Sequence, residues 1–389
     1  MTDGQRSINS FSADTHTETV VQTVVLDLET SEAKNKKVTI GIEEFQRIAG
    51  FFGDIMPSIP EYERTRNNPA FYNLVKREFA DSAIKSSVAR DAAYHAIAMY
   101  DSHSSNGSAG DRPDLGNGSF MQLCSQDFEI ADNGSGYGLK ASFIPYDAVW
   151  FGISLNPHTE KYLRRVFEDE AETGSCELHL SDDGDLRAHV AIKWEVEVYE
   201  AEDVSTVIGV DIGENVLYSV AAVDGDSDVE SVEMESGAEF RHYREQFKQK
   251  RTSLMEKGDL RALSQCRDEH RRYTEQTLDT ASRRVVEFAV EHEPSVLVLE
   301  DLTHYRETAD DPIHDWPFAD LQEKICYKAT AEGIPVETVD PKDTSITCRK
   351  CGQAIPEFRD GTEFSCRRCG YEVHADVNAA INIAKRYAE

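Results

Sequence analysis

Residues 366–386, CRRCGYEVHADVNAAINIAKR, join a pair of cysteines to a segment with helix-forming composition. Its apolar residues recur at helical spacing, which predicts a terminal helix with a buried face. Cys366 and Cys369 have the spacing of a metal knuckle, and the glycine after them lets the backbone fold back. One carboxylate, Asp376, lies between the knuckle and the helix. Its role depends on the rest of the chain.

A second cysteine pair, Cys348 and Cys351, occurs in TCRKCG, with 14 residues between the two pairs. Four thiolates in a tetrahedral array select zinc and leave no coordination position open. The spacing therefore predicts a structural zinc site formed by Cys348, Cys351, Cys366 and Cys369, in preference to disulfides or chance pairs. The remaining cysteines are scattered singly, and we expect them to be buried apolar residues.

The composition describes a globular protein of 389 residues in which 40% of the residues are hydrophobic. No run approaches the ~18 apolar residues that span a bilayer, and residues 1–18 lack the apolar segment of a signal peptide. These features predict a cytoplasmic protein without membrane association. Thiols stay reduced in that compartment, which agrees with a metal site.

The formal net charge of −31 is unusual, and the acidic residues are spread along the whole chain. At molar salt the Debye length falls to about 3 Å, which screens repulsion between carboxylates. We therefore interpret the composition as that of a halophilic protein. The overall negative charge then does not exclude a nucleic-acid partner. The charge of individual surface regions is the relevant evidence for such a partner.

The first half of the chain is predicted to be rich in strands. VVQTVVLDLE reads as the first strand, and residues 138–156 and 176–200 alternate as further strands. Helical patterns at 42–56 and from Pro69 through Tyr100 interrupt them. The predicted organisation is a flexible N-terminus at 1–19, a β-barrel-like domain at 20–203, a helical insertion within it at about 42–103, and a linker or long loop at 102–119.

From residue 204 onward, the chain shows a different order of predicted strands and helices. STVIGVDIG, NVLYSVAAVDG and DVESVEME predict three strands, followed by a helical region from about Phe240 to His292 that is interrupted near Gly258. SVLVLEDL predicts a strand covered on both faces. A helix ending at Gly333, a strand and the terminal helix complete the order of an α/β, ribonuclease-H-like (RuvC) fold. The predicted boundaries are 204–342 and 372–389 for this domain and 343–371 for an inserted zinc ribbon.

Three acidic residues lie at the ends of these predicted elements. Asp211 ends the first strand, Glu300 ends SVLVLE, and Asp376 opens the terminal helix. In a ribonuclease-H-like sheet these ends lie side by side, so the carboxylates could hold two Mg²⁺ or Mn²⁺ ions for phosphodiester cleavage. Singly, each acid is also typical of a turn or a helix cap. Asp301 should point to the opposite face of the sheet.

Basic residues concentrate in residues 241–285, which hold 12 Lys and Arg against 7 Asp and Glu. This surplus predicts a surface that follows phosphates, although a solvated helix face with internal ion pairs explains it almost as well. The zinc knuckles carry further basic residues. The candidate nucleic-acid-binding residues are Arg241, Arg244, Lys248, Lys250, Arg251, Arg271, Arg272, Arg349, Lys350, Arg367 and Arg368.

The motifs GVDIG, LVLEDL, TCRKCG…FSCRRCG and HADVNAAINIAKR resemble those of the TnpB (OrfB) family, which insertion sequences encode. The similarity covers roughly residues 204–389 and, more faintly, 138–200; DWPFADLQEKICYKA also matches, including Trp316. The resemblance implies an RNA-guided DNA endonuclease with a RuvC-like domain interrupted by a zinc ribbon. It further implies a wedge-like barrel with a helical recognition insert at the N-terminus.

Carried over by position, the resemblance makes Asp211, Glu300 and Asp376 the catalytic acids and the four knuckle cysteines the zinc ligands. Many family members have an acid and a basic residue where this chain has His374 and Ala375. Neither is a metal ligand in the family's scheme. The N-terminal third matches poorly, so its recognition residues cannot be assigned.

The function expected from these features is transposon-associated, RNA-guided cleavage of target double-stranded DNA by two-metal-ion hydrolysis. The guide RNA would come from the transposon end. One alternative is a catalytically silent, domesticated RNA-guided repressor, which the intact acids disfavour. Another is a guide-free RuvC-like or ribonuclease-H-like nuclease, which the long N-terminal half disfavours.

Overall fold

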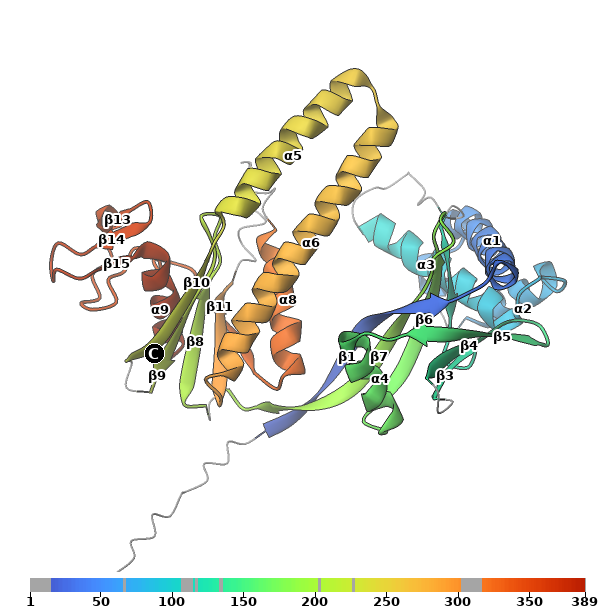
Figure 1. Ribbon diagram of the computed structural model, residues 1–389, viewed down its shortest axis with the longest axis horizontal. Coiled ribbons are helices and arrows are strands. Elements are labelled where there is room, and N and C mark those ends of the chain that lie inside the picture. Colours follow the sequence, from blue (N-terminus) through green and yellow to red (C-terminus); the bar gives the residue numbers. More distant parts are fainter. Residues whose placement is uncertain are drawn as a thin grey trace, which may run out of the picture. The chain divides into compact units, whose positions relative to one another are not determined.

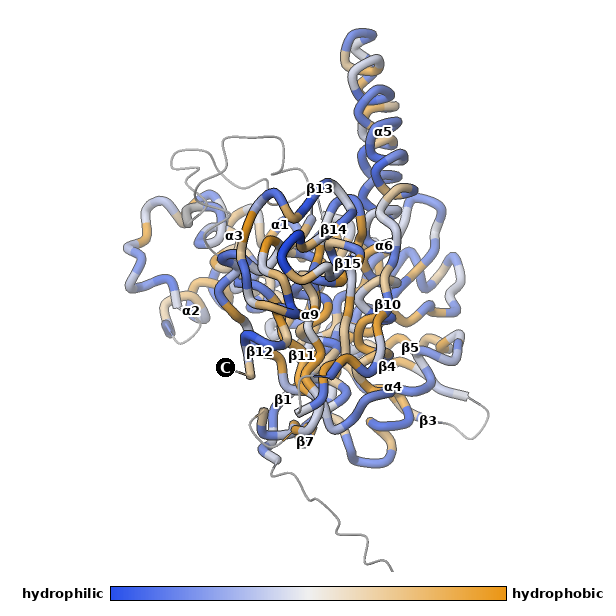
Figure 2. Tube along the Cα trace, turned by 90° about the vertical axis from the view of Figure 1, so that its left-hand side faces the viewer, coloured by the Kyte–Doolittle hydropathy of each residue, from blue (hydrophilic) through white to orange (hydrophobic). Residues whose placement is uncertain are grey.

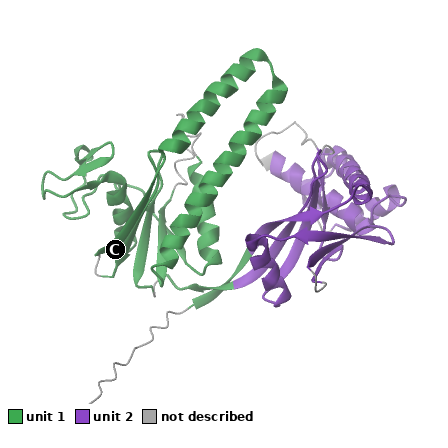
Figure 3. Cartoon of the chain, viewed as in Figure 1, with its two compact units in different colours: residues 1–20, 196–389 green, residues 21–195 purple. Residues whose placement is uncertain are grey.

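The computed structural model describes residues 15–65, 68–105, 115, 118–132, 136–201, 204–225, 228–301 and 317–388. The chain forms two compact units (Figure 3), one of residues 21–195 and one of residues 1–20 with 196–389. Most of the predicted N-terminal lead, most of the predicted linker at 102–119, and Trp316 lie outside the described residues. No helix in the described part of the chain is both long and apolar enough to cross a membrane.

The unit of residues 21–195 contains a seven-stranded sheet with strand order β2-β6-β7-β1-β5-β4-β3. Long alternating stretches form its inner strands, with one face buried and the other exposed. Its strands are β1 (Thr15–Glu29), β2 (Phe120–Leu123), β3 (Phe128–Asp132), β4 (Tyr137–Ile144), β5 (Asp147–Ser154), β6 (Ala171–Leu180) and β7 (Leu186–Tyr199). Its α-helices are α1 (Glu32–Ile55), α2 (Pro69–Glu78), α3 (Ser86–Ser105) and α4 (Pro157–Phe167).

Three of these helices lie between β1 and β2 in sequence, where a helical insertion was predicted, but two details of that prediction were wrong. First, α1 begins at Glu32 rather than near residue 42, because Ser31 caps it by accepting a hydrogen bond from the Lys34 backbone nitrogen. Second, the helical stretch from Pro69 is two helices. Between them the backbone nitrogen of Lys85 donates to the carbonyl of Phe143, which ties this break to the sheet.

The other unit contains a five-stranded sheet with strand order β10-β9-β8-β11-β12. Neighbours β10, β9 and β8 are antiparallel, whereas β11 lies between β8 and β12 and is parallel to both. The strands are β8 (Thr206–Asp211), β9 (Val216–Asp224), β10 (Val229–Ser236), β11 (Ser295–Glu300) and β12 (Val336–Val339). This is the order that a ribonuclease-H-like fold requires, so the predicted fold class is confirmed.

Helices cover both faces of this sheet (Figure 1). On one face, α6 (Leu260–Val290) and α8 (Phe318–Ala331) pack on alternate residues of β8 and β11, including Ile208 and Leu297. On the other face, α9 (Ala375–Ala388) packs on the intervening residues, with Ile383 against Val298. The apolar run in β11 is therefore buried on both sides, as its sequence predicted.

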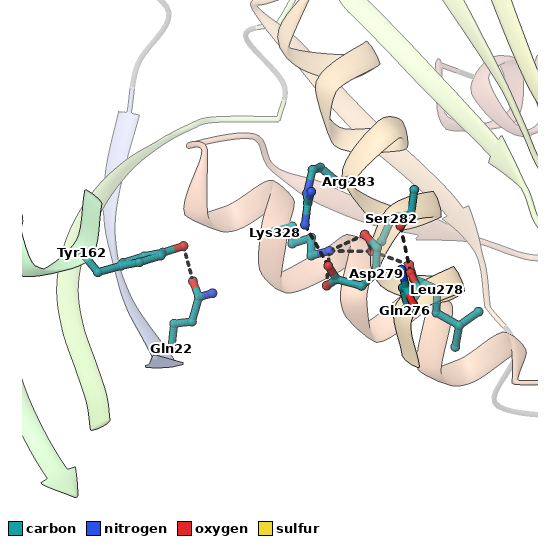
Figure 4. Close-up of polar contacts among 9 residues, drawn as sticks. Gln22, Tyr162, Gln276, Leu278, Asp279, Ser282, Arg283 and Lys328 are labelled. Atoms are coloured by element: carbon teal, nitrogen blue, oxygen red, sulfur yellow. Dashed lines mark hydrogen bonds and ion pairs between the residues drawn. The ribbon is translucent and has the colours of Figure 1, made fainter. Parts of the chain in front are cut away.

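Hydrogen bonds of one lysine tie the two helices on the first face together. Lys328 of α8 donates from Nζ to three acceptors on α6: Asp279 Oδ1 at 2.7 Å, the Asp279 carbonyl at 2.8 Å and Ser282 Oγ at 2.8 Å (Figure 4). These bonds use all three protons of the ammonium group.

Helices α5 (Ala238–Lys257) and α6 form a long hairpin, which turns at Gly258 in the left-handed conformation. Figure 2 shows that α5 is mostly hydrophilic along its length.

Candidate functional site

The ends of β8 and β11 bring two of the predicted acids together. The parallel pairing joins Thr206 with Ser295 and Gly209 with Val298. The same register continued by two residues sets Asp211 beside Glu300, each the last residue of its strand. Neighbouring strands lie about 4.8 Å apart. Strand pairing alone therefore makes these two carboxylates neighbours at one edge of the sheet.

Alternation along the strands decides which face these carboxylates occupy. Gly209 and Val298 face α9, because Gly209 approaches its backbone and Val298 packs on Ile383. Asp211 and Glu300 lie two residues further on and share that face. Asp301 follows the last residue of β11, and its placement on the opposite face stays a prediction.

The third acid comes from the start of α9. A Cβ atom on Gly209 would lie 2.7 Å from the backbone nitrogen of Ala384 and would overlap the carbonyl oxygen of Ala380. The absence of a side chain at Gly209 therefore lets α9 rest directly on β8. Asp376 lies one helical turn before Ala380, and its side chain is buried. Near the other end of α9, the hydroxyl of Tyr387 donates to the carbonyl of Ala201, ahead of β8. The first turn of α9 therefore lies at the end of β8 that carries Asp211.

The pKa of Asp211 reflects the nearness of the other two acids. Burial raises the pKa of Asp211 well above its ordinary range, and the nearby charges of Glu300 and Asp376 raise it further. By accessible surface the residue Asp211 is half-buried. Burial also raises the pKa of Glu300, opposed by the hydroxyl of Thr344, which donates to Glu300 Oε1 at 2.5 Å. Crowded carboxylates with raised pKa values favour a bound cation, which would relieve their repulsion.

The side chain of Arg359 places a positive charge beside these acids. Arg359 Nη2 lies 2.7 Å from Asp376 Oδ1, and the charge of Arg359 also lowers the pKa of Asp211. Among the described residues, the groups whose ligand atoms all lie within 4.8 Å of one another do not include the three acids. The oxygen donors suit Mg²⁺ or Mn²⁺, but such an ion would compete with Arg359 for Asp376.

The four cysteines predicted to bind zinc lie close together. Their Sγ atoms all lie within 4.8 Å of one another, with Cys348 and Cys369 at 3.7 Å and Cys351 and Cys366 at 3.6 Å. A tetrahedral site with Zn–S bonds of about 2.3 Å has sulfurs about 3.8 Å apart. These spacings fit zinc, and they are far longer than the ~2 Å of a disulfide.

The two cysteine knuckles have the same backbone conformation. In each knuckle the glycine after the second cysteine takes a positive φ, +68° at Gly352 and +69° at Gly370, and donates to the carbonyl of the first cysteine. Three short strands flank the knuckles: β13 (Arg359–Asp360), β14 (Glu363–Ser365) and β15 (Glu372–His374). Because Arg359 is on β13 and β15 leads directly into α9, the zinc knuckles position both Arg359 and Asp376.

The predicted basic residues do not form one uniform surface. Lys250 and Arg271 pair with acids of α6, Glu269 at 2.7 Å and Glu275 at 3.1 Å. Arg349 lies over the ring of Tyr371 at 5.1 Å. A groove of about 840 Å³ between α6 and α8 contains Arg271 and Arg272, but acidic side chains line it as well. The exposed members of the predicted set are Lys248, Lys250, Arg251, Arg271, Arg272, Lys350, Arg367 and Arg368.

Sequence reasoning missed Arg359 and Thr344. Both lie outside any motif, and each reaches its acid only through the folded backbone. The sequence carries no local signal for either contact. It also missed Arg386, whose positive charge opposes the raised pKa of Glu300.

Comparison with known proteins finds relatives in sequence and in fold. Residues 318–383 match the family model of the Cas12f1-like TNB domain. The chain is 29% identical over 236 residues to the CRISPR-associated endodeoxyribonuclease Cas12f1 of Sulfoacidibacillus thermotolerans, covering 57% of this chain and 55% of that protein. It is 26% identical over 204 residues to the TnpB-like protein MJ0751 of Methanocaldococcus jannaschii, covering 49% and 72%.

Solved structures share the fold. The Cas12f1 chain in a cryo-EM complex with sgRNA and target DNA superposes with a TM-score of 0.58 at 15% identity, covering 95% of this chain and 99% of that one. The mini-RNA-guided endonuclease CRISPR-Cas_phi3 gives 0.56 at 11% identity, covering 95% and 92%. The chain spans about half the length of the curated Cas12f1 relatives it matches. The predicted relationship is confirmed: the chain is a homologue of Cas12f1 and TnpB-like proteins, with a Cas12f1-like TNB domain at residues 318–383.

Proposed function

We propose that this chain is an RNA-guided DNA endonuclease that cuts target DNA at Asp211, Glu300 and Asp376. One observation supports the proposal: the register of β8 against β11, continued by two residues, sets Asp211 beside Glu300, and the charge of Asp376 acts on Asp211 from the start of α9. The names of the relatives, endodeoxyribonucleases and TnpB-like proteins, support the same reaction class.

The three carboxylates would hold one or two Mg²⁺ or Mn²⁺ ions, which activate water and stabilise the leaving oxygen in phosphodiester hydrolysis. The chain's own residues prepare the site. Thr344 fixes one oxygen of Glu300 by its hydrogen bond. Arg359 neutralises Asp376, and a bound ion would take over that role. The four cysteines of the zinc knuckles contact no substrate; they fix the backbone that delivers Arg359 and Asp376.

The proposed partners are a guide RNA, from the end of a transposon, and a target double-stranded DNA. Pairing between guide and target would supply sequence specificity. The exposed basic residues of the α5–α6 hairpin and of the zinc knuckles are the proposed phosphate contacts. Since the surface is strongly acidic overall, this local positive charge has to act at short range.

The test is to purify the full chain at high salt and sequence the RNA that accompanies it. The purified complex is then given Mg²⁺ and a DNA duplex matching that RNA. The proposal expects one enriched RNA species and cleavage of the matching DNA, with cleavage lost in Asp211→Ala. A guide-free nuclease would cut without RNA, and a domesticated repressor would bind its target without cutting it. Either result would refute the proposal.

A further inference from the structure

A further set of metal-ligating side chains gathers on the sheet of residues 21–195, apart in the sequence from the acids and cysteines. Glu177 and His179 lie on β6, and His189 lies on β7. One ligand atom of each lies within 4.8 Å of the others. The register explains the grouping: Glu177 is directly opposite His189, and His179 is two residues further along the same face of β6.

The three side chains already face one another. His179 Nε2 lies 2.9 Å from Glu177 Oε2, and the rings of His179 and His189 stack with centroids 4.1 Å apart. The side chain of His179 is 29% exposed and that of Glu177 is 38% exposed. An ion from solvent can therefore reach the cluster without opening the core.

Aromatic neighbours hold the cluster in place. The ring of Phe120 on β2 stacks on His179 at 5.2 Å, and His95 of α3 meets Phe120 edge-on at 5.2 Å. These contacts fix the position of the His179 ring at one side of the cluster.

We propose that Glu177, His179 and His189 bind a divalent transition-metal ion of the zinc type, at a site distinct from the cysteine and carboxylate sites. Two imidazoles and one carboxylate are a common zinc ligand set, and three protein ligands leave a position for water. Mg²⁺ and Ca²⁺ prefer oxygen donors and suit this site poorly. A bound ion would link β6 to β7 through side chains, in addition to their backbone hydrogen bonds.

Co²⁺ reports on this site separately from the other two. The full chain is first loaded with one zinc ion per chain, which fills the four cysteines, and Mg²⁺ is kept in excess for the acids. Co²⁺ is then titrated and its visible absorption is recorded. The wild type is expected to take up one further ion with bands free of the thiolate charge transfer that cysteine-bound cobalt would show.

His179→Gln with His189→Gln removes both imidazoles while retaining polar groups. Losing an outer-shell partner alone costs roughly 10- to 100-fold in metal affinity, so the double variant should bind Co²⁺ at least ~100-fold more weakly. His158→Gln, on α4, is the matched control and should bind like the wild type. Retained zinc and an unchanged far-UV circular dichroism spectrum show that a variant is folded.

Should the double variant misfold, Glu177→Gln provides the same test by replacing one charged ligand with a neutral one, with weaker binding and shifted bands expected. The proposal is overturned if the wild type takes up no Co²⁺ beyond the zinc-filled cysteines. It is equally overturned if a folded double variant binds Co²⁺ as tightly as the wild type. Neither outcome bears on DNA cleavage, which depends on the other unit.

Discussion

Gly209→Ala tests whether the direct contact between β8 and α9 sets the geometry of the acids. The added Cβ atom would lie 2.7 Å from the Ala384 nitrogen, where ordinary contacts begin at 3.4 Å, and would overlap the Ala380 oxygen. Both obstacles are backbone atoms, so no side chain can move aside. Relieving the first contact alone moves α9 by at least ~0.7 Å, and relieving the overlap with the Ala380 oxygen as well takes about twice that displacement in a close-packed interior.

That displacement carries Asp376 away from Asp211. Overpacking of this kind costs about 1–3 kcal/mol of unfolding free energy, and a misplacement of about 1 Å in a catalytic group costs about 100-fold in rate. The assays are denaturant unfolding and single-turnover cleavage with saturating guide RNA, target DNA and Mg²⁺. We expect both losses together, with zinc content unchanged.

Gly225→Ala is the matched control, because a Cβ atom there meets nothing within 4 Å. It should leave cleavage and stability at wild-type values. The reasoning is refuted if Gly209→Ala cuts at the wild-type rate. It is also refuted if the control loses as much activity, because the effect would then not come from the contact with α9.

Three further predictions concern the supports of the site. Lys328→Met should cost about 1–3 kcal/mol of unfolding free energy, since it removes charged hydrogen bonds between α6 and α8. Burial raises the pKa of Asp279, but the hydrogen bond and charge of Lys328 help hold that pKa below its ordinary 3.8, so the ion pair stabilises the fold above that pH and its contribution is lost as the pH falls through the lowered value. The difference in unfolding free energy between the two proteins should therefore narrow in acid to the part due to the carbonyl and hydroxyl acceptors; a difference that does not change with pH contradicts this. Arg359→Gln should lower the Mg²⁺ concentration for half-maximal cleavage roughly tenfold, because a charged hydrogen bond of about 1.5 kcal/mol no longer competes with the ion; an unchanged or higher requirement in a metal titration contradicts it. Cys351→Ser should release zinc and remove about 10 kcal/mol of local folding energy, seen as lost hydrogen-exchange protection in the knuckles, whereas Cys326→Ala should keep its zinc; full zinc in Cys351→Ser would count against the site.

The features that the sequence predicted correctly are those with a local signature. The knuckle cysteines were recognisable because each pair lies within one turn, and Gly352 and Gly370 give the conformation that such a turn needs. The strand of Ser295–Glu300 was recognisable from its continuous apolar run. Gly258 ended one helix of the hairpin where expected.

Features that depend on tertiary contacts were not predictable. The short strands β2 and β3 were missed, because four or five residues between turns give too little alternation. The pairing of Glu177 with His189 depends on the register of β6 against β7, which the sequence does not state. Arg359 approaches Asp376 only because the zinc knuckles fold back onto the start of α9.

The central claim, that Asp211, Glu300 and Asp376 share divalent ions, is tested most directly by Mn²⁺ binding to Asp211→Asn. Electron paramagnetic resonance counts bound Mn²⁺ in the zinc-loaded full chain, and cleavage of guide-matched DNA is measured in the same samples. We predict that the wild type binds Mn²⁺ and cuts, whereas Asp211→Asn keeps its zinc and its fold but loses both Mn²⁺ at this site and cleavage. Undiminished Mn²⁺ binding and cleavage in Asp211→Asn would contradict the account.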